Sequence, residues 1–129
     1  MQQEDGSVNI GKGTFTVTGD YRAQIESTND AGDTVWNNSE ARLTMENDED
    51  TVTVGGGFYW QGHYSSYWNE YGAYLSAGTL SVAGDFLGTT SFLASGSHKV
   101  ILNGSETQVV QFSSKGTISI LDIHESNDL

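Results

Sequence analysis

The chain has 129 residues, and its 17 acidic and 5 basic side chains give a formal net charge of −12. This charge disfavours contact with nucleic-acid phosphates and with anionic membranes, so we expect neither as a partner. The absence of cysteine excludes disulfides, thiolate metal sites and cysteine nucleophiles. With 3 Trp, 6 Tyr and 5 Phe, the chain carries more apolar material than a disordered segment does, and one folded domain is expected.

The chain opens on a polar run, Met1–Asp5, that lacks an apolar leader. We expect an excised segment of a longer protein, with the secretion signal and any anchor outside these residues. The alternating pattern begins soon after this run. It predicts a lead-in over residues 1–10, a single β domain built from repeats over residues 11–123 and a tail over residues 124–129.

One pattern returns three times in the domain: apolar, any residue, Val, any residue, Gly, then Asp or Gly, then an aromatic residue. The matching positions are Phe15, Val52 and Leu80; Val17, Val54 and Val82; Gly19, Gly56 and Gly84; and Tyr21, Phe58 and Phe86. A fainter fourth copy over residues 116–120 aligns Ile120 with Val82. Internal repetition of this kind is typical of stacked architectures.

The repeat predicts an all-β fold without a long helix. Two alternating apolar residues make a strand with one buried face, and Gly-Asp then makes a corner, since Gly adopts positive φ and Asp bonds its own backbone. A single unit cannot bury its apolar face, but stacked units can. We therefore predict a parallel β-solenoid of about four degenerate coils, with a β-sandwich as the alternative.

The acidic run over residues 46–50 interrupts the repeat and has two interpretations. Clustered carboxylates are the ligands that Ca²⁺ prefers, but the run lacks the spacing of the known calcium loops. A solvated turn is the favoured interpretation, and no metal or other cofactor is expected. Later in the chain, His98-Lys99 is expected to mark the entry to a strand, with Lys99 pointing outward and Val100 inward.

An aromatic insert over residues 59–74 is the candidate binding site. Exposed Trp and Tyr rings offer flat apolar surfaces with polar edges, which suit sugar rings or protein partners. The candidate ligand-binding residues are Tyr64, Tyr67, Trp68 and Tyr71. The alternative is that the insert packs as a lid over the core. Trp60 directly follows a repeat strand and is expected to be buried, whereas Trp68 lies among polar residues and is expected to be exposed.

Catalysis finds little support in the sequence, and we expect no enzyme. Asp20 and Asp85 form an acidic pair of the kind that glycosidases use, but both occupy the repeated corner position. The three His residues are far apart and lack zinc-site spacing. No catalytic residue is assigned.

Residues 78–86, 94–104 and 108–113 together resemble a repeat of large secreted surface proteins from Clostridium-type Firmicutes. That repeat reads roughly GTLxVxGDF, then SGxHKVxLxG, then QxVxF, and the resemblance covers about residues 11–123. The block His98-Lys99-Val100 is its most specific part, and Gly57 departs from it where the repeat has Asp or Asn. The resemblance implies an extracellular or cell-surface location and a repeated architecture, and it carries no catalytic residues.

From these observations we expect a structural spacer or adhesion module of an extracellular bacterial surface protein. The alternative is a carbohydrate-binding module that uses the aromatic insert. A glycan or protein partner is expected at that insert. End-to-end self-association is also expected, because a stack of strands exposes open edges at its ends.

Overall fold

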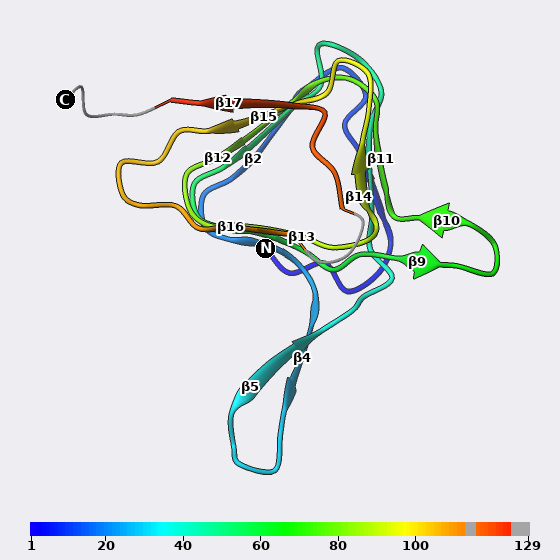
Figure 1. The fold of residues 1–129 in the computed structure, drawn as a ribbon, viewed down its shortest axis with the longest axis vertical. Helices are drawn as coiled ribbons and strands as arrows, with labels where there is room; N and C mark the ends of the chain where they lie inside the picture. Colours follow the sequence, from blue (N-terminus) through cyan, green and yellow to red (C-terminus); the bar gives the residue numbers. More distant parts are fainter. Residues whose placement is uncertain (113–115, 125–129) are drawn as a thin grey trace.

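The computed structural model describes residues 1–112 and 116–124, and within them the fold is all-β and contains no helix. Most strands are parallel and lie in stacked sheets, as predicted, whereas the sheets of a β-sandwich are antiparallel. Three parallel sheets surround a common interior (Figure 1). Two antiparallel hairpins project from them.

Each of the three parallel sheets takes strands from widely separated parts of the chain. Sheet I contains β1 (Ser7–Asn9), β6 (Arg42–Met45), β11 (Ala73–Leu75) and β14 (Phe92–Ala94). Sheet II contains β2 (Thr14–Val17), β7 (Thr51–Val54), β12 (Thr79–Val82), β15 (Lys99–Leu102) and β17 (Ile120–Ile123). Sheet III contains β3 (Tyr21–Ala23), β8 (Phe58–Trp60), β13 (Phe86–Gly88) and β16 (Val110–Phe112). We call each consecutive set of strands, one from each sheet, a layer.

The register of sheets II and III confirms the three-copy alignment made from the sequence. In sheet II, Phe15 pairs with Val52 and Val52 with Leu80, while Val17, Val54 and Val82 form a second row. In sheet III, Tyr21 pairs with Phe58 and Phe58 with Phe86. Residues at these repeated positions therefore stack on their counterparts in the next layer.

The predicted fourth copy is wrong in register. Val82 pairs with Leu102, and Leu102 pairs with Ile123, so Ile120 lies opposite Lys99 on the outward row. The sequence alignment missed β15 because the strand is followed by Asn103-Gly104 and a longer connection, without an aromatic residue close behind. The outward position of Lys99 and the burial of Val100 at this strand agree with the prediction.

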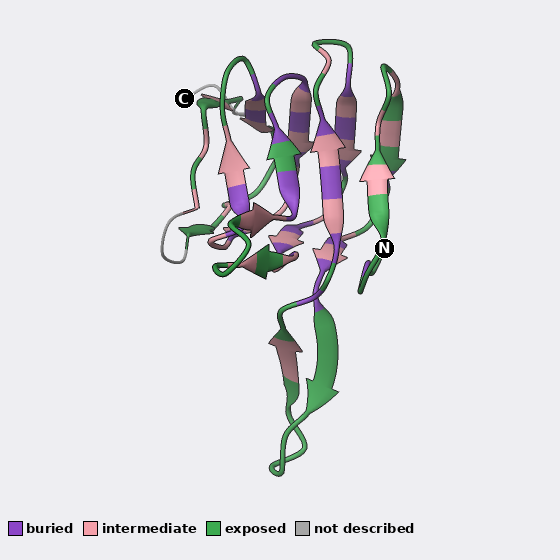
Figure 2. Ribbon diagram, turned by 90° about the vertical axis from the view of Figure 1, so that its right-hand side faces the viewer, coloured by how far each residue is buried: buried purple, intermediate pink, exposed green. Residues whose placement is uncertain are grey.

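The interior is filled by the inward residues of all three sheets, and Figure 2 shows buried bands running from strand to strand. Aromatic side chains form a column along sheet III. The ring centroids of Tyr21 and Phe58 lie 5.1 Å apart, and those of Phe58 and Phe86 lie 5.4 Å apart. Such offset and tilted contacts stabilise aromatic pairs beyond the area they bury.

The corner aspartates bond one layer to the next. Asp20 Oδ1 accepts the backbone N–H of Gly57 at 2.8 Å, and Asp85 Oδ1 accepts that of Val109 at 2.9 Å. Both carboxylates therefore have a structural role at the corner between sheets II and III.

The acidic run over residues 46–50 is a turn organised around Asp50, whose side chain is fully buried. Its carboxylate accepts the backbone N–H groups of Lys12, Glu46 and Asn47. Desolvation alone would raise the pKa of Asp50, but these donors outweigh it and hold the pKa below its usual value. The run therefore has a structural explanation that requires no metal.

The first ten residues contribute to the sheets, since β1 pairs with β6 and Gln2 forms a bridge with Arg22. Of the predicted tail, residues 125–129 lie outside the described part of the chain. The sequence analysis missed the longer hairpin, β4 (Ile25–Thr28) and β5 (Thr34–Asn37), which projects from the sheets and is largely exposed (Figures 1 and 2).

His98 is a buried histidine whose two ring nitrogens have no hydrogen-bond partner among the described residues. Burial lowers its pKa from 6.5 to about 4 because the charged form is poorly solvated there. The unfolded chain therefore binds a proton at a pH where the folded chain does not, and stability is lost as the pH falls from about 6.5 towards 4.

We predict that His98→Leu removes this acid sensitivity. Its unfolding free energy relative to the unsubstituted chain should rise by about 3 kcal/mol between pH 7 and pH 4, measured by urea denaturation. Equal pH dependence of His98→Leu and the unsubstituted chain would contradict the assignment to His98.

Candidate binding site: the aromatic hairpin

The second hairpin consists of β9 (Tyr64–Ser65) and β10 (Glu70–Tyr71), and we call residues 63–71 the aromatic hairpin. Tyr64 pairs with Tyr71, and Ser65 pairs with Glu70. Ser65 Oγ accepts the backbone N–H of Trp68 at 3.2 Å, and Asn69 adopts a positive φ of 52°. Both features are typical of tight turns, which explains why the chain reverses here.

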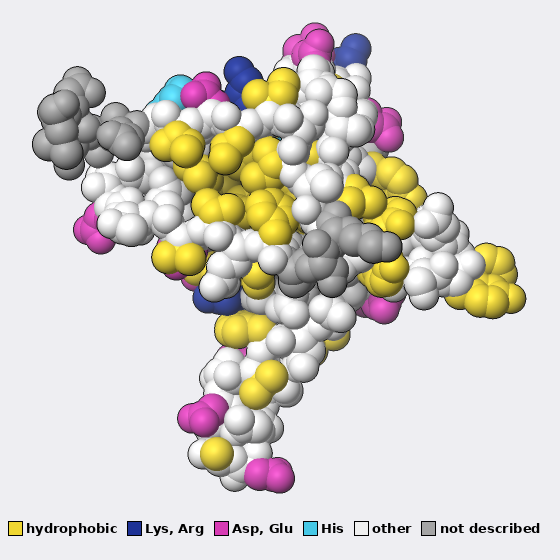
Figure 3. All heavy atoms as spheres, in the orientation of Figure 1, with side chains coloured by type: hydrophobic (Ala, Val, Ile, Leu, Met, Phe, Trp, Pro, Cys, Tyr) yellow, Lys and Arg dark blue, Asp and Glu magenta, His cyan; other side chains and the backbone are white. Residues whose placement is uncertain are grey.

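The tip of the aromatic hairpin presents two large rings to solvent. Tyr67 is 84% exposed and Trp68 is 70% exposed, and their ring centroids lie 4.8 Å apart in an edge-to-face arrangement. Figure 3 shows hydrophobic atoms at the end of this projection, well away from the main body. Rings held in this way bury little apolar area in the chain itself and remain available for contact.

The base of the hairpin is held by a hydrogen-bonded network of side chains centred on His63. Its Nδ1 lies 2.6 Å from a carboxylate oxygen of Glu40, and its Nε2 lies 3.1 Å from one of Glu70. Arg42 donates to Glu70 at 3.3 Å, and the hydrogen bonds from His63 and Arg42 lower the pKa of Glu70. The network ties the hairpin to β6 and to the segment before it.

Two hollows adjoin the hairpin, one beside each of its paired tyrosines. The hollow beside Tyr71 has a volume of about 190 Å³, and Tyr74, Glu46, Ser76 and Leu93 are among its lining residues. The hollow beside Tyr64 has a volume of about 170 Å³ and is lined by amide and hydroxyl groups. Those polar residues are Asn38, Gln61, Thr89, Thr90 and Ser91.

The structure brings all four predicted site residues together on this one hairpin. Tyr64 and Tyr71 lie 5.5 Å apart between ring centroids at the base, and Tyr67 and Trp68 form the tip. The predicted insert over residues 59–74 is too long, because its first residues belong to β8 and its last residues belong to β11. Trp60 is fully buried, as expected, and its Nε1 donates to Ser91 Oγ at 2.8 Å.

The sequence placed Tyr74 in the aromatic insert but not among the four ligand-binding residues, and it missed Leu93. These two residues pair on the outward row of sheet I and line the hollow beside Tyr71. Period-two alternation could have placed them outward once β11 and β14 had been aligned. It also missed a stack in which the Arg22 guanidinium lies 4.3 Å from the ring centroid of Trp36 and 4.1 Å from that of Tyr59. This stack attaches the hairpin β4–β5 to sheet III.

Residues 1–112 and 116–124 contain no group of three or more His, Cys, Asp or Glu side chains placed to hold a metal ion. No helix able to cross a membrane occurs in the same part of the chain.

We predict opposite responses for the two tryptophans. Trp68→Ala should change the free energy of unfolding by no more than about 0.5 kcal/mol, while Trp60→Ala should lower it by about 3–5 kcal/mol. Denaturant titration measures both. In single-Trp variants, acrylamide should quench Trp68 fluorescence strongly and Trp60 fluorescence weakly. Equal shielding would remove Trp68 from the candidate site.

No protein-family model, curated protein or solved structure matches this chain. Its function is therefore argued from its own geometry.

Proposed function

We propose that the chain is a structural spacer or adhesion module of an extracellular bacterial surface protein, folded as a parallel β-solenoid. The observation that supports this most is the unbroken parallel register of sheet II, where five strands pair in line. Neighbouring strands lie about 4.8 Å apart, so the stack is roughly 20 Å long. Since each layer contacts only its neighbours, length is set by the number of layers.

A spacer of this kind offers fixed length and direction, which a flexible linker cannot. The corner bonds of Asp20 and Asp85 and the buried carboxylate of Asp50 all join successive layers or turns through backbone donors. The hairpins project sideways from the stack, so they can carry contacts without interrupting it. An adhesion role therefore requires only that a hairpin binds a ligand.

The spacer proposal predicts that length can be changed by adding a layer. A second copy of residues 73–91, inserted after Ser91, should fold and add about 4.8 Å to the distance between spin labels at Thr16→Cys and Asp122→Cys. Pulsed electron paramagnetic resonance measures this distance, and the far-UV β spectrum should be retained. The control inserts the same residues in scrambled order. An unfolded product, or an unchanged distance, contradicts the proposal.

The second candidate function is carbohydrate binding at the aromatic hairpin. Two features of the hairpin support it: Tyr67 and Trp68 are exposed at its tip, and a polar hollow lies beside Tyr64 at its base. Sugars are bound by ring stacking combined with hydrogen bonds from amides and hydroxyls. Glu40, Glu46 and Glu70 border the same region, so a neutral glycan is favoured over an anionic one.

On a glycan array, the unsubstituted chain should bind neutral glycans and Trp68→Ala should lose at least about tenfold in affinity, equivalent to roughly 1.4 kcal/mol. Trp36→Ala is the matched control, since it removes a tryptophan from the other hairpin and should keep the binding. Absence of glycan binding by the unsubstituted chain, or equal loss in both variants, contradicts this candidate and leaves the spacer.

A further inference from the structure

The end of the stack that carries β16 and β17 is apolar and open. Val110 and Phe112 follow the inward row of sheet III, and Leu121 and Ile123 follow that of sheet II. The exposed fractions of these four residues are 40%, 38%, 46% and 61% in the same order. The counterparts of Leu121 and Ile123 one layer below are almost completely covered, with Val100 at 0% and Leu102 at 5%. Figure 3 shows a hydrophobic patch on the face that carries these strands.

The backbone at this end is also available for pairing. β16 and β17 are the last strands of sheets III and II, and each pairs with a described strand on one side only. A free strand edge next to an apolar surface is a template for a further strand.

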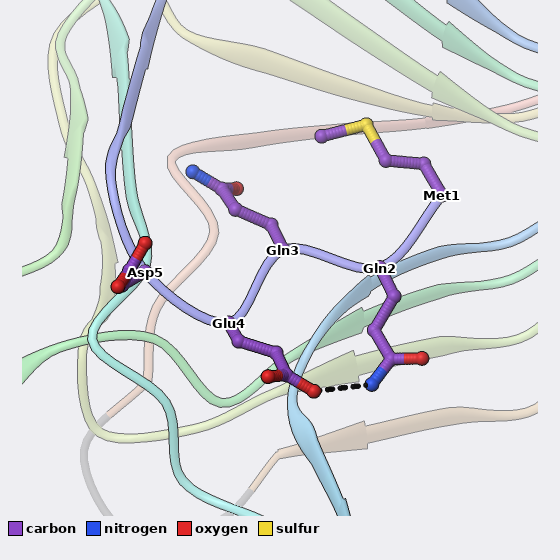
Figure 4. Close-up of a pocket in the computed structure, with 5 residues that line it drawn as sticks. All are labelled: Met1, Gln2, Gln3, Glu4 and Asp5. Carbon is purple, nitrogen blue, oxygen red and sulfur yellow. Dashed lines mark hydrogen bonds between the residues drawn. The ribbon is translucent and has the colours of Figure 1, made fainter.

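The opposite end of the stack has a different surface. Gln3 is buried there and its side chain bonds Gly6 O at 3.0 Å and Arg42 O at 3.1 Å, while the Tyr21 hydroxyl donates to Gln3 Oε1 at 2.6 Å. Figure 4 shows Gln2 and Glu4 bonded to each other on the side opposite to Gln3. A hollow of about 490 Å³ lies over Met1–Asp5. This polar, hollowed end does not complement the apolar end.

Charge separates the two ends as well. Eleven of the 17 acidic residues lie within the first 50 positions, which contain the first layer, the hairpin β4–β5 and β6, the first strand of the second layer. Among the described residues after Leu102, the carboxylate side chains are Glu106 and Asp122, and the latter lies 3.0 Å from His124. A contact between two β17 ends therefore keeps the most acidic parts of two copies far apart.

We propose that two copies of this chain associate tail to tail, with the β16–β17 end of one copy against the same end of the other. A two-fold axis normal to sheet II places β17 antiparallel to β17 of the second copy and keeps both inward rows facing the shared interior. On sheet II, Leu121 and Ile123 then cover the same residues of the second copy, as in a symmetric dimer. Head-to-tail stacking would instead place an apolar end on the polar end held by Gln3.

Light scattering after size exclusion tests the association. The unsubstituted chain should have twice its 13.9 kDa mass at high micromolar concentration. Leu121→Glu should weaken the association at least tenfold, whereas Ile120→Glu, on the outward row of the same strand, should leave it unchanged. Both residues are exposed in the monomer, and circular dichroism checks that both variants fold. A monomer throughout the concentration range, or equal effects of the two variants, overturns the proposal.

Cysteine cross-linking tests the polarity, because the chain has no cysteine of its own. Asp122→Cys lies near the middle of β17 and should give a disulfide-linked dimer under mild oxidation. Thr16→Cys, on β2 at the other end of sheet II, should not. A series of oligomers larger than the dimer, or cross-linking through Thr16→Cys instead, would indicate head-to-tail stacking and overturn the tail-to-tail arrangement. The proposal does not depend on either proposed function.

Discussion

Parallel pairing in a fixed register governs the whole structure, because it places each inward side chain on the equivalent side chain of the next layer. Side chains alternate between the two faces of a strand, so a shift of one residue would expose an entire inward row. The row formed by Val17, Val54 and Val82 shows the consequence, since none of the three is more than 7% exposed. Gly and Asp at the corners serve this register by letting the chain turn at the same place in successive layers.

Polar side chains are also buried at the corners. Asp50 and His98 avoid the cost of burying an unpaired charge in two different ways. Asp50, Gly78 and His98 occupy the same position in successive layers, each directly before a strand of sheet II. Thr79 N–H donates to the carbonyl of Asp50, and Lys99 N–H donates to that of Gly78. Asp50 is surrounded by backbone N–H donors and remains stable as a carboxylate. His98 has no such partner and remains neutral. One position in the layer thus accommodates either a satisfied charge or an uncharged ring.

The sequence predicted the strands whose layers keep the full repeat, because there alternation, the corner Gly and the following aromatic residue all agree. The repeat alignment left out β15 and misaligned β17, although the strand at β15 and its inward Val100 were predicted. Leu102 and Ile123 extend the inward row there, but no aromatic residue follows at the repeated spacing. The hairpin β4–β5 was not predicted from the sequence, for a different reason. Its exposed strands have no buried face, so they leave no apolar row to detect.

The aromatic residues of the candidate site could be identified because they cluster in one short part of the sequence. Which rings are buried and which are exposed could be predicted from whether a residue adjoins a repeat strand. Trp60 belongs to a strand and is buried, whereas Trp68 lies at a turn and is exposed. The hollows beside the hairpin could not be predicted, because lining residues such as Thr89 and Leu93 come from later turns of the chain. Their position relative to Tyr64 and Tyr71 depends on the stacking of layers.

Gly57 stands where the corner of two other layers has Asp, and the reason lies on the outer face of sheet III. A Cβ atom at this position would lie about 2.5 Å from ring atoms of Tyr59, far inside contact distance. That ring supports Arg22, and Arg22 in turn supports Trp36 of the longer hairpin. A side chain at residue 57 would therefore displace the Tyr59 ring, and with it the support that Arg22 gives to the longer hairpin.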